Sequence, residues 1–416
     1  MMLKEKLREP QRYFLMFGKW TLLAFLMGAI GGSVAGVFHH ALHFVTHLRS
    51  AHMWLVWLLP LAGLVSVAIY HVCKLRENRG TNEIIDTVLD GGSLNPLIAP
   101  VIFVTTSITH LFGGSAGREG AALQLGSAIA SGLSKLFRLS SDDRSVLIMS
   151  GMSALFAGLF GTPLTACLFT MEFSSVGVIF SPALLPCYLA AFVASQASLV
   201  LGVHPETYFL AASLPITMTV TIKVAVLSIL VAILGITMCH TFHHAEHLGK
   251  KLFPNTYLRI AVGGALIALL TFFVGDHRFN GAGMDMALAA VGGQADWYSF
   301  AVKLVFTAIT LASGFKGGEI VPTFCIGATF GCVLGPMLGL DPGIAAAIGL
   351  IGLFCCATNS PLTSIILSME MFGSNNLYMF AWVCVITFAL SGHSSLYTSQ
   401  IIRYHKASTS GNRGRY

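Results

Sequence analysis

Long stretches without a charged residue recur along the whole chain, separated by short segments that hold most of the charged side chains. Each stretch meets or approaches the roughly 20 apolar residues that a helix needs to cross a bilayer, and several could form two helices. The stretches are residues 20–48, 53–73, 91–117, 145–171, 173–205, 224–245, 260–275, 342–369 and 371–402. The pattern predicts an all-α polytopic membrane protein with about a dozen membrane helices.

The composition agrees with this prediction. Of the 416 residues, 55% are hydrophobic and 10% are charged, so the chain has too few polar groups to cover a soluble globule of its size. Basic residues outnumber acids in residues 1–19 and 403–416, which predicts cytoplasmic termini for a multi-pass protein of the cell (inner) membrane. This asymmetry accounts for the net charge of +6. We therefore expect no nucleic-acid partner.

Glycine and proline interrupt many of the apolar stretches, and the chain has 43 Gly and 14 Pro in all. Irregular backbone at membrane depth is tolerated only where protein or a water-filled cavity satisfies its N–H and C=O groups. Broken helices therefore indicate a transport site. One such break, GFKGGEIVP at residues 314–322, holds Glu319 between apolar stretches, where a carboxylate is costly.

The chain contains an internal repeat. In the first half GGSAGREG, with Glu119, precedes PLTACLFTMEF; in the second half SGFKGGE, with Glu319, precedes PLTSIILSMEMF, and the two glutamates lie 200 residues apart. We expect an N-terminal segment at 1–19, a first membrane repeat at 20–205, a second at 206–402 and a C-terminal tail at 403–416. If each repeat crosses the membrane an odd number of times, the second is inverted and the corresponding breaks converge.

The two breaks have the chemistry of an anion site. Helix N-termini present unpaired N–H groups and the positive end of the helix dipole, and glycine lets an ion approach the backbone closely. The glycines concerned are Gly117, Gly120, Gly317 and Gly318. Their alternative role is close helix packing, which small residues often serve in membranes. Because each break also carries an acid, we favour the anion site.

Cysteine and histidine offer alternative chemistry. The nine cysteines lie almost all inside apolar stretches without metal-ligand spacing, so we interpret them as packed thiols. Two sets of histidines recur at helical spacing: His39, His40, His43 and His47, and His240, His243, His244 and His247. Histidines at a membrane interface need no ligand, and a metal or proton role is the alternative. We predict no metal, no cofactor and no enzymatic activity.

Three motifs carry a resemblance to a known family. GREG at residues 117–120, GGEIVP at 317–322 and SGHSSLY at 391–397 resemble, in order and spacing, the signature regions of the CLC chloride channel and transporter family. The resemblance implies an inverted-repeat homodimer of tilted and broken helices in the lipid bilayer, with an anion path in each protomer. Because the chain ends soon after Tyr397, we expect no cytoplasmic regulatory domain.

The resemblance also implies roles for single residues. Glu119 resembles a gating glutamate, whose carboxylate competes with the anion and leaves when it is protonated, and Tyr397 resembles a tyrosine that donates its hydroxyl to the anion. The other anion-binding positions implied by the match are Gly80, Thr81, Gly117, Gly120, Gly318, Ile320 and Val321. The structural alternatives are an ion pair of Glu119 with Arg118 or a lysine, and one of Glu319 with Lys316.

Glu319 decides which branch of the family the chain resembles. Ordinary chloride-type members have an apolar residue there, whereas an acid resembles the fluoride-exporting CLC-F branch, in which the second glutamate handles protons. The resemblance thus implies a proton-coupled antiporter that exports fluoride; the alternatives are a chloride or other halide transporter and a passive chloride channel. Two departures bear on selectivity. Val321 stands where many fluoride-branch members have threonine, and Gly80-Thr81-Asn82 matches the remaining anion-site turn without its proline.

Overall fold

The computed structural model describes residues 2–75, 79–208, 210, 213–403 and 406, with side chains from residue 12 onward. These residues form sixteen α-helices, eight in each half of the chain. The first eight are α1 (Met2–Ala51), α2 (Leu59–Val72), α3 (Thr81–Asp90), α4 (Ile98–Leu111), α5 (Glu119–Leu136), α6 (Ser141–Phe160), α7 (Pro163–Glu172) and α8 (Leu184–Val200). The second eight are α9 (Met218–Leu252), α10 (Thr256–Val274), α11 (Met284–Val291), α12 (Ser299–Ser313), α13 (Ile320–Leu334), α14 (Pro342–Thr358), α15 (Pro361–Phe372) and α16 (Leu377–Leu390).

Shorter elements connect the helices. Four are short pieces of 3₁₀-helix: η1 (Met53–Leu58), η2 (Ser181–Ala183), η3 (His277–Phe279) and η4 (Pro336–Leu338). Two short strands, β1 (Ser175–Val176) and β2 (Ile401–Ile402), pair in parallel. This pairing brings the segment after Tyr397 back against the end of the first half.

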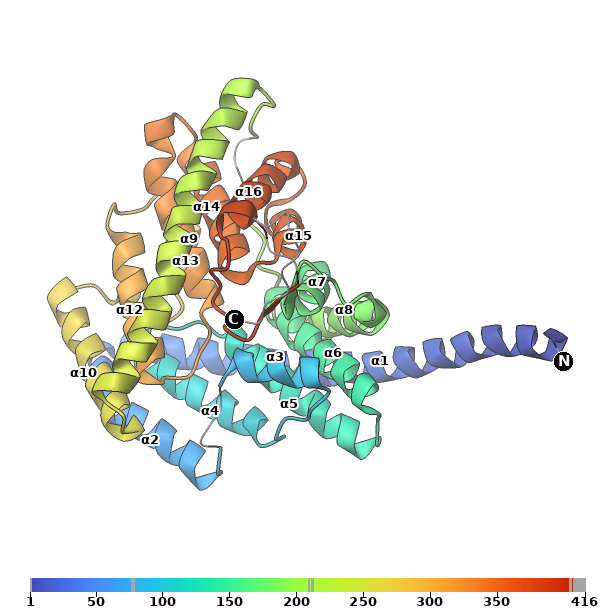
Figure 1. The fold of residues 1–416 in the computed structure, drawn as a ribbon. Coiled ribbons are helices and arrows are strands. Elements are labelled where there is room, and N and C mark those ends of the chain that lie inside the picture. The colour runs from blue at the N-terminus through green and yellow to red at the C-terminus, as the bar shows by residue number, and fades with distance from the viewer. Residues whose placement is uncertain (1, 76–78, 209, 211–212, 404–405, 407–416) are drawn as a thin grey trace.

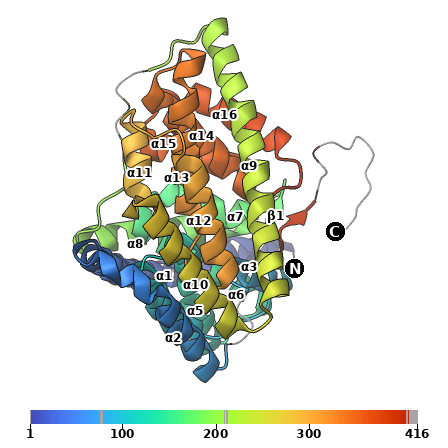
Figure 2. The same ribbon diagram turned by 90° about the vertical axis from the view of Figure 1, so that its left-hand side faces the viewer.

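The two halves lie against each other, with α7 and α15 between them (Figure 1). In Figures 1 and 2 most of the blue-to-green first half lies below the orange-to-red second half, while α9 and α10 extend down along one side, where α10 packs on α2. Helices in corresponding positions have corresponding neighbours: α5 packs on α6 as α13 packs on α14, and α4 packs on α5 as α12 packs on α13. The sequence repeat is therefore also a structural repeat.

Repeated local signals end and start the helices that lead to the centre. Gly161 ends α6 and Asn359 ends α14, both with left-handed backbone, at φ 69° and 56°. Proline then opens the next helix in each half, at Pro163 and Pro361, where its missing N–H costs nothing. The same turn is thus built twice from related residues.

Glycine brings the helices of each half into close contact. A Cβ atom on Gly126 of α5 would collide with the backbone carbonyl of Gly151 on α6, and one on Gly327 of α13 would collide with that of Gly349 on α14. These crossings occupy corresponding places in the two halves. The packing role that we weighed for glycine therefore applies to these four residues.

The membrane helices differ in length from the sequence prediction. By length and composition, seven spans in the described part of the chain could cross a membrane, and five further apolar helices have only 10–17 residues. The difference arises because breaks cut the apolar stretches: residues 91–117 yield only α4, and residues 342–402 yield three short helices. At the N-terminus α1 runs without a break through residues 19 and 20, where we expected the membrane segment to begin.

Candidate functional site

The two glycine-rich breaks meet at the centre of the molecule. The N–H of Gly117 donates to the carbonyl of Gly318 at 2.6 Å, and the N–H of Gly318 donates back to Gly117 at 2.7 Å. The approach requires glycine, because a Cβ atom on Gly318 would lie 2.5 Å from the backbone nitrogen of Gly120. The start of α5 is therefore joined to the start of α13, as the repeat predicts.

Glu119 is the first residue of α5 and its side chain is completely buried. Its Oε2 accepts a hydrogen bond of 3.2 Å from the N–H of Val321 in the first turn of α13, whereas its Oε1 has no hydrogen-bond partner among the described residues. A helix N-terminus stabilises negative charge there. The carboxylate thus lies where an anion could bind, and its partner is not Arg118, which donates to Glu206 and His39.

Glu319 stands in the corresponding position, directly before α13, and is partly buried. Its Oε2 faces α5, because a Cβ atom on Gly120 would lie 3.6 Å away from it. The two carboxylates are close enough to interact electrostatically. Lys316 holds its ammonium 4.6 Å from the centre of the Tyr70 ring, and the described residues include no ion pair between it and Glu319.

Tyr397 completes this group from the other end of the chain. Its side chain is buried, and its hydroxyl has no hydrogen-bond partner within the described ranges. Both Glu119 and Glu319 are near enough to interact electrostatically with its phenol. A buried hydroxyl without a partner is unusual in a folded protein, and this one is free to donate to a ligand.

The start of α3 also reaches the site region. Thr81, its first residue, is buried, and the N–H of Ser399 donates to the side chain of Asn82 at 3.0 Å. A Cβ atom on Gly80 would lie 3.8 Å from the amide of Gln124, which donates to the carbonyl of Gly120. The start of α3 thus lies against the segments that follow Glu119 and Tyr397. The buried backbone of Ile320 belongs to the same α13 start as Val321.

Sequence reasoning missed a buried cation beside the first break. Lys303 of α12 has no exposed surface, and its ammonium donates to the hydroxyl of Ser115 (3.0 Å) and to the carbonyls of Phe279 (3.1 Å) and Gly281 (2.6 Å). These bonds fix the segment that leads into Glu119. A single lysine within an otherwise uncharged stretch was the available signal.

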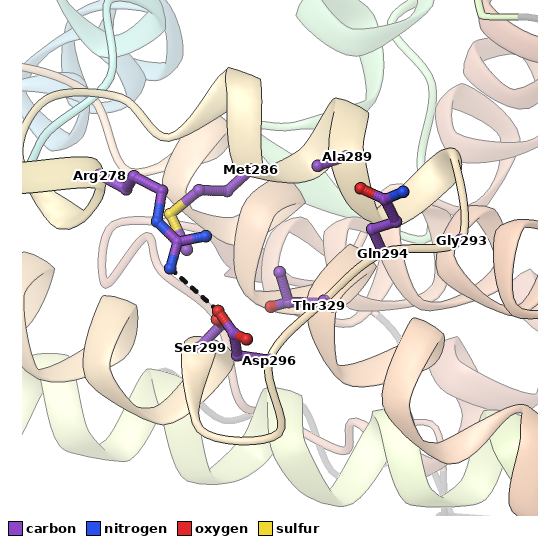
Figure 3. A pocket seen from close by; sticks show the side chains of 9 residues that line it. Arg278, Met286, Ala289, Gly293, Gln294, Asp296, Ser299 and Thr329 are labelled. Carbon is purple, nitrogen blue, oxygen red and sulfur yellow. Dashed lines mark hydrogen bonds and ion pairs between the residues drawn. The ribbon is translucent and has the colours of Figure 1, made fainter. Parts of the chain in front are cut away.

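A cleft in the second half of the chain lies elsewhere (Figure 3). It has a volume of about 430 Å³ and is lined by Arg278, Met286, Ala289, Gly293, Gln294, Ala295, Asp296, Ser299 and Thr329. Hydrogen bonds to Asp276 and Asp296 raise the pKa of Arg278 above its usual range, so this residue stays charged. Thr329 is the one lining residue on α13, and ten residues of helix place it about 15 Å beyond Glu319. The cleft is therefore separate from the carboxylate pair.

The histidines and cysteines of the described ranges were the alternative candidates for metal binding. No group of three or more His, Cys, Asp or Glu side chains there could hold a metal ion. All nine cysteines are free, and eight of them are buried. The fold and the site thus define a helical membrane transport protein with carboxylates at paired helix breaks.

Comparison with known proteins identifies the family. Residues 62–392 match the voltage gated chloride channel family, so the chain belongs to this family, the CLC proteins, whose members are transporters or channels and not enzymes. It is 35% identical over 410 residues to the "Chloride/fluoride channel protein" of Pseudomonas syringae pv. tomato, covering 96% of this chain and 91% of that one.

Solved structures agree on the fold. The crystal structure of a CLC-type fluoride/proton antiporter is similar with a TM-score of 0.90 and 34% identity, covering 92% of this chain and 98% of that one. A slow cyanobacterial Cl⁻/H⁺ antiporter has a TM-score of 0.75 at 19% identity, covering 89% and 94% of the two chains. The resemblance read from the three motifs is therefore confirmed at the level of the family and fold.

Proposed function

We propose that the protein is a proton-coupled antiporter that exports fluoride across the cell membrane, with Glu119 as the gate and Glu319 as the second proton carrier. The observation that carries this proposal is the bond from the N–H of Val321 to the carboxylate of Glu119. An ionised carboxylate there competes with an anion for the positive end of α13. Protonation removes the charge of Glu119 and so the attraction that holds its side chain at the start of α13. Proton binding and anion binding therefore become linked.

Fluoride is favoured over chloride by the second acid. Glu319 adds a carboxylate next to Gly120, so two titratable groups reach one anion position. Fluoride is small, accepts strong hydrogen bonds and is the conjugate base of a weak acid, which suits a site that handles protons. The absence of a side-chain hydroxyl on Val321 does not remove its N–H from the site. The names of two relatives above include fluoride, which supports the same choice.

The alternative is a chloride or other halide transporter, or a passive chloride channel. Val321 favours it, because a side chain without a hydroxyl gives a small anion one donor fewer. Whether the anion is fluoride or another halide, its proposed contacts are the hydroxyl of Tyr397 and the backbone around Ile320 and Gly318. Gly80, Thr81, Gly117 and Gly120 complete the proposed site.

The setting of the protein is part of the proposal. We place the chain in the cell (inner) membrane with both termini in the cytoplasm, because basic residues concentrate in 1–19 and 403–416. Residues 20–205 and 206–402 form the two repeats, inverted relative to each other. Membership of the family supports a homodimer with one anion path per protomer as part of this proposal.

The test is transport by purified protein in liposomes. We expect fluoride efflux to drive proton uptake and chloride efflux to be much slower. Glu319→Ala should abolish the proton uptake, because a dry site without that carboxylate has no group there that can bind a proton. Lys316→Ala is the matched control and should leave coupling intact. Equal chloride flux without proton movement would support the channel instead, and undiminished proton uptake by the Glu319 variant would remove its proton role.

A further inference from the structure

Arg118 directly precedes Glu119, the proposed gate, yet the ion pair of its guanidinium is with another acid, Glu206. Nη2 donates to Oε1 of Glu206, and Nη1 donates to Nδ1 of His39 at 3.0 Å. The guanidinium also lies over the Phe160 ring, 5.5 Å from its centre, and 3.5 Å from the carbonyl of Leu159. Because Arg118 and Glu206 have side-chain exposures of only 15% and 18%, water screens this ion pair weakly.

His39 has a defined role in this arrangement. Arginine can only donate, so Nδ1 of His39 must accept and its imidazole must be neutral. The negative charge that balances Arg118 is the carboxylate of Glu206. His39 belongs to the histidine set of the sequence analysis, where its stacking on His43 continues the row.

Glu206 is held by both halves of the molecule. It lies in the linker between α8 and α9, where its N–H donates to the carbonyl of Phe160 at 3.0 Å. Its Oε2 accepts from the hydroxyl of Tyr208 at 3.3 Å. The N–H of Tyr208 donates to the carbonyl of Met371 at 2.7 Å. The hydroxyl of Tyr208 also lies 3.1 Å from the sulfur of Met284. The linker thus fixes the carboxylate of Glu206 against the residue next to the gate.

The charges around Arg118 come from several elements. Glu119 shares its own segment, His39 faces it from α1, His110 interacts with it electrostatically from α4, and Glu206 and Tyr208 face it from the linker. Further away, Asp285 of α11 interacts electrostatically with Tyr208. Of these groups, Glu206 is the one that pairs directly with Arg118. Glu119, the next residue in the chain, also interacts electrostatically with Arg118, so it is the acid with which the guanidinium would pair if Glu206 lost its charge.

We propose that Glu206 is a positioning residue that, through Arg118, keeps the gating carboxylate free to exchange between the anion site and a proton. Removing its charge releases Arg118, whose guanidinium then pairs with ionised Glu119 and opposes its protonation. The linker between α8 and α9 would therefore set the pH range over which the gate operates. This inference rests on the proposed role of Glu119 as the gate.

The experiment uses the full-length protein in liposomes and measures anion efflux and proton uptake from about pH 4 to 8. Carboxyl groups with ordinary and with raised pKa values titrate in this range. Glu206→Gln should move the pH of half-maximal efflux down by about 1 to 3 units, the usual effect of a guanidinium beside a carboxylate. Glu206→Asp should restore most of the wild-type profile. Asp296→Asn, which removes one acid from the separate Arg278 ion pair, should leave the profile unchanged.

A double variant distinguishes positioning from packing. If Glu206 acts on the Glu119 carboxylate, Glu206→Gln should have no further effect on efflux in the Glu119→Gln protein. If Glu206→Gln changed efflux equally in wild type and in the Glu119→Gln protein, the proposal would be overturned. Should Glu206→Gln fail to fold, Tyr208→Phe removes only the supporting hydroxyl and should shift the profile in the same direction, and an unshifted profile would again overturn it. Wild type without proton uptake would refute the antiporter but leave this comparison of efflux valid.

Discussion

Buried carboxylates at helix ends have contrasting surroundings in this protein. Glu172 accepts three hydrogen bonds, from the N–H of Leu362 (3.2 Å) and from the N–H (2.9 Å) and hydroxyl (2.6 Å) of Thr363. Glu119 is buried more completely, yet its bond to another helix comes from one donor, the N–H of Val321, and its Oε1 has no partner among the described residues. A carboxylate with many donors is fixed, whereas one with few loses little when it moves or is protonated. The surroundings of each acid, and not its residue type, separate the structural group from the proposed gate.

Tyr397 permits a test at the scale of a single hydroxyl. Its phenol is buried and has no partner in the described part of the chain, so a bound anion would be its first acceptor. Tyr397→Phe should weaken anion binding by about 1.5 to 3 kcal/mol, the usual value of a hydrogen bond to a charged group. Calorimetric titration with fluoride and with chloride measures this loss.

Tyr378→Phe provides the control for this titration, because Tyr378 of α16 is 51% exposed on the surface of the protein. The control should bind anions like wild type. Equal affinities for wild type and Tyr397→Phe would show that the tyrosine only packs, for example through its edge contact with Phe173.

Helices α7 and α15 cap each other. Glu172, the last residue of α7, accepts from the start of α15, while Glu370 near the end of α15 accepts from Leu164 and Thr165 at the start of α7. Each carboxylate satisfies N–H groups that no residue within the helix can reach. The repeated PLT and ME pairs of the sequence are the two sides of this reciprocal contact.

The sequence could not reveal this pairing. It showed that PLT precedes ME in each half, but Glu172 and Thr363 are separated by 191 residues, and nothing in a single sequence says which cap belongs to which helix. The repeat itself, the apolar stretches and the carboxylates at the breaks could all be predicted, because they depend on residue type and spacing. The partners of Arg118 and Lys303 could not, because they depend on how the halves pack.

The reciprocal cap predicts a loss of stability. Glu172→Gln removes one charged acceptor and turns an amide donor toward the N–H groups of α15, leaving at least one of them unsatisfied. The midpoint of thermal unfolding in detergent should fall, with a loss of about 1 to 3 kcal/mol. Glu246→Gln is the control, since the side chain of Glu246 is 51% exposed and its ion pair with Lys250 is at the surface. An unchanged midpoint for Glu172→Gln would mean that the cap adds nothing to stability.

At the scale of the whole molecule, the orientation of the chain can be derived from one cysteine. If the N-terminus is cytoplasmic, the span at 12–51 ends outside and the span at 53–72 returns, so Cys73 lies on the cytoplasmic side. Lys74 and Arg79, which follow it, agree with this placement. Cys73 is also the one cysteine that is not buried, so thiol labelling reports on a single known position.

A membrane-impermeant maleimide should therefore leave the protein unlabelled in intact cells and label it after permeabilisation. Cys73→Ser should abolish the labelling in both conditions, because the other eight cysteines are buried. Adding Ser50→Cys to that variant, at the exposed end of α1, should give the opposite result, with labelling in intact cells. Labelling of Cys73 from outside, together with protection of the thiol introduced by Ser50→Cys, would show that the protein has the opposite orientation in the membrane. The cytoplasmic N-terminus that we infer from the basic residues would then be wrong.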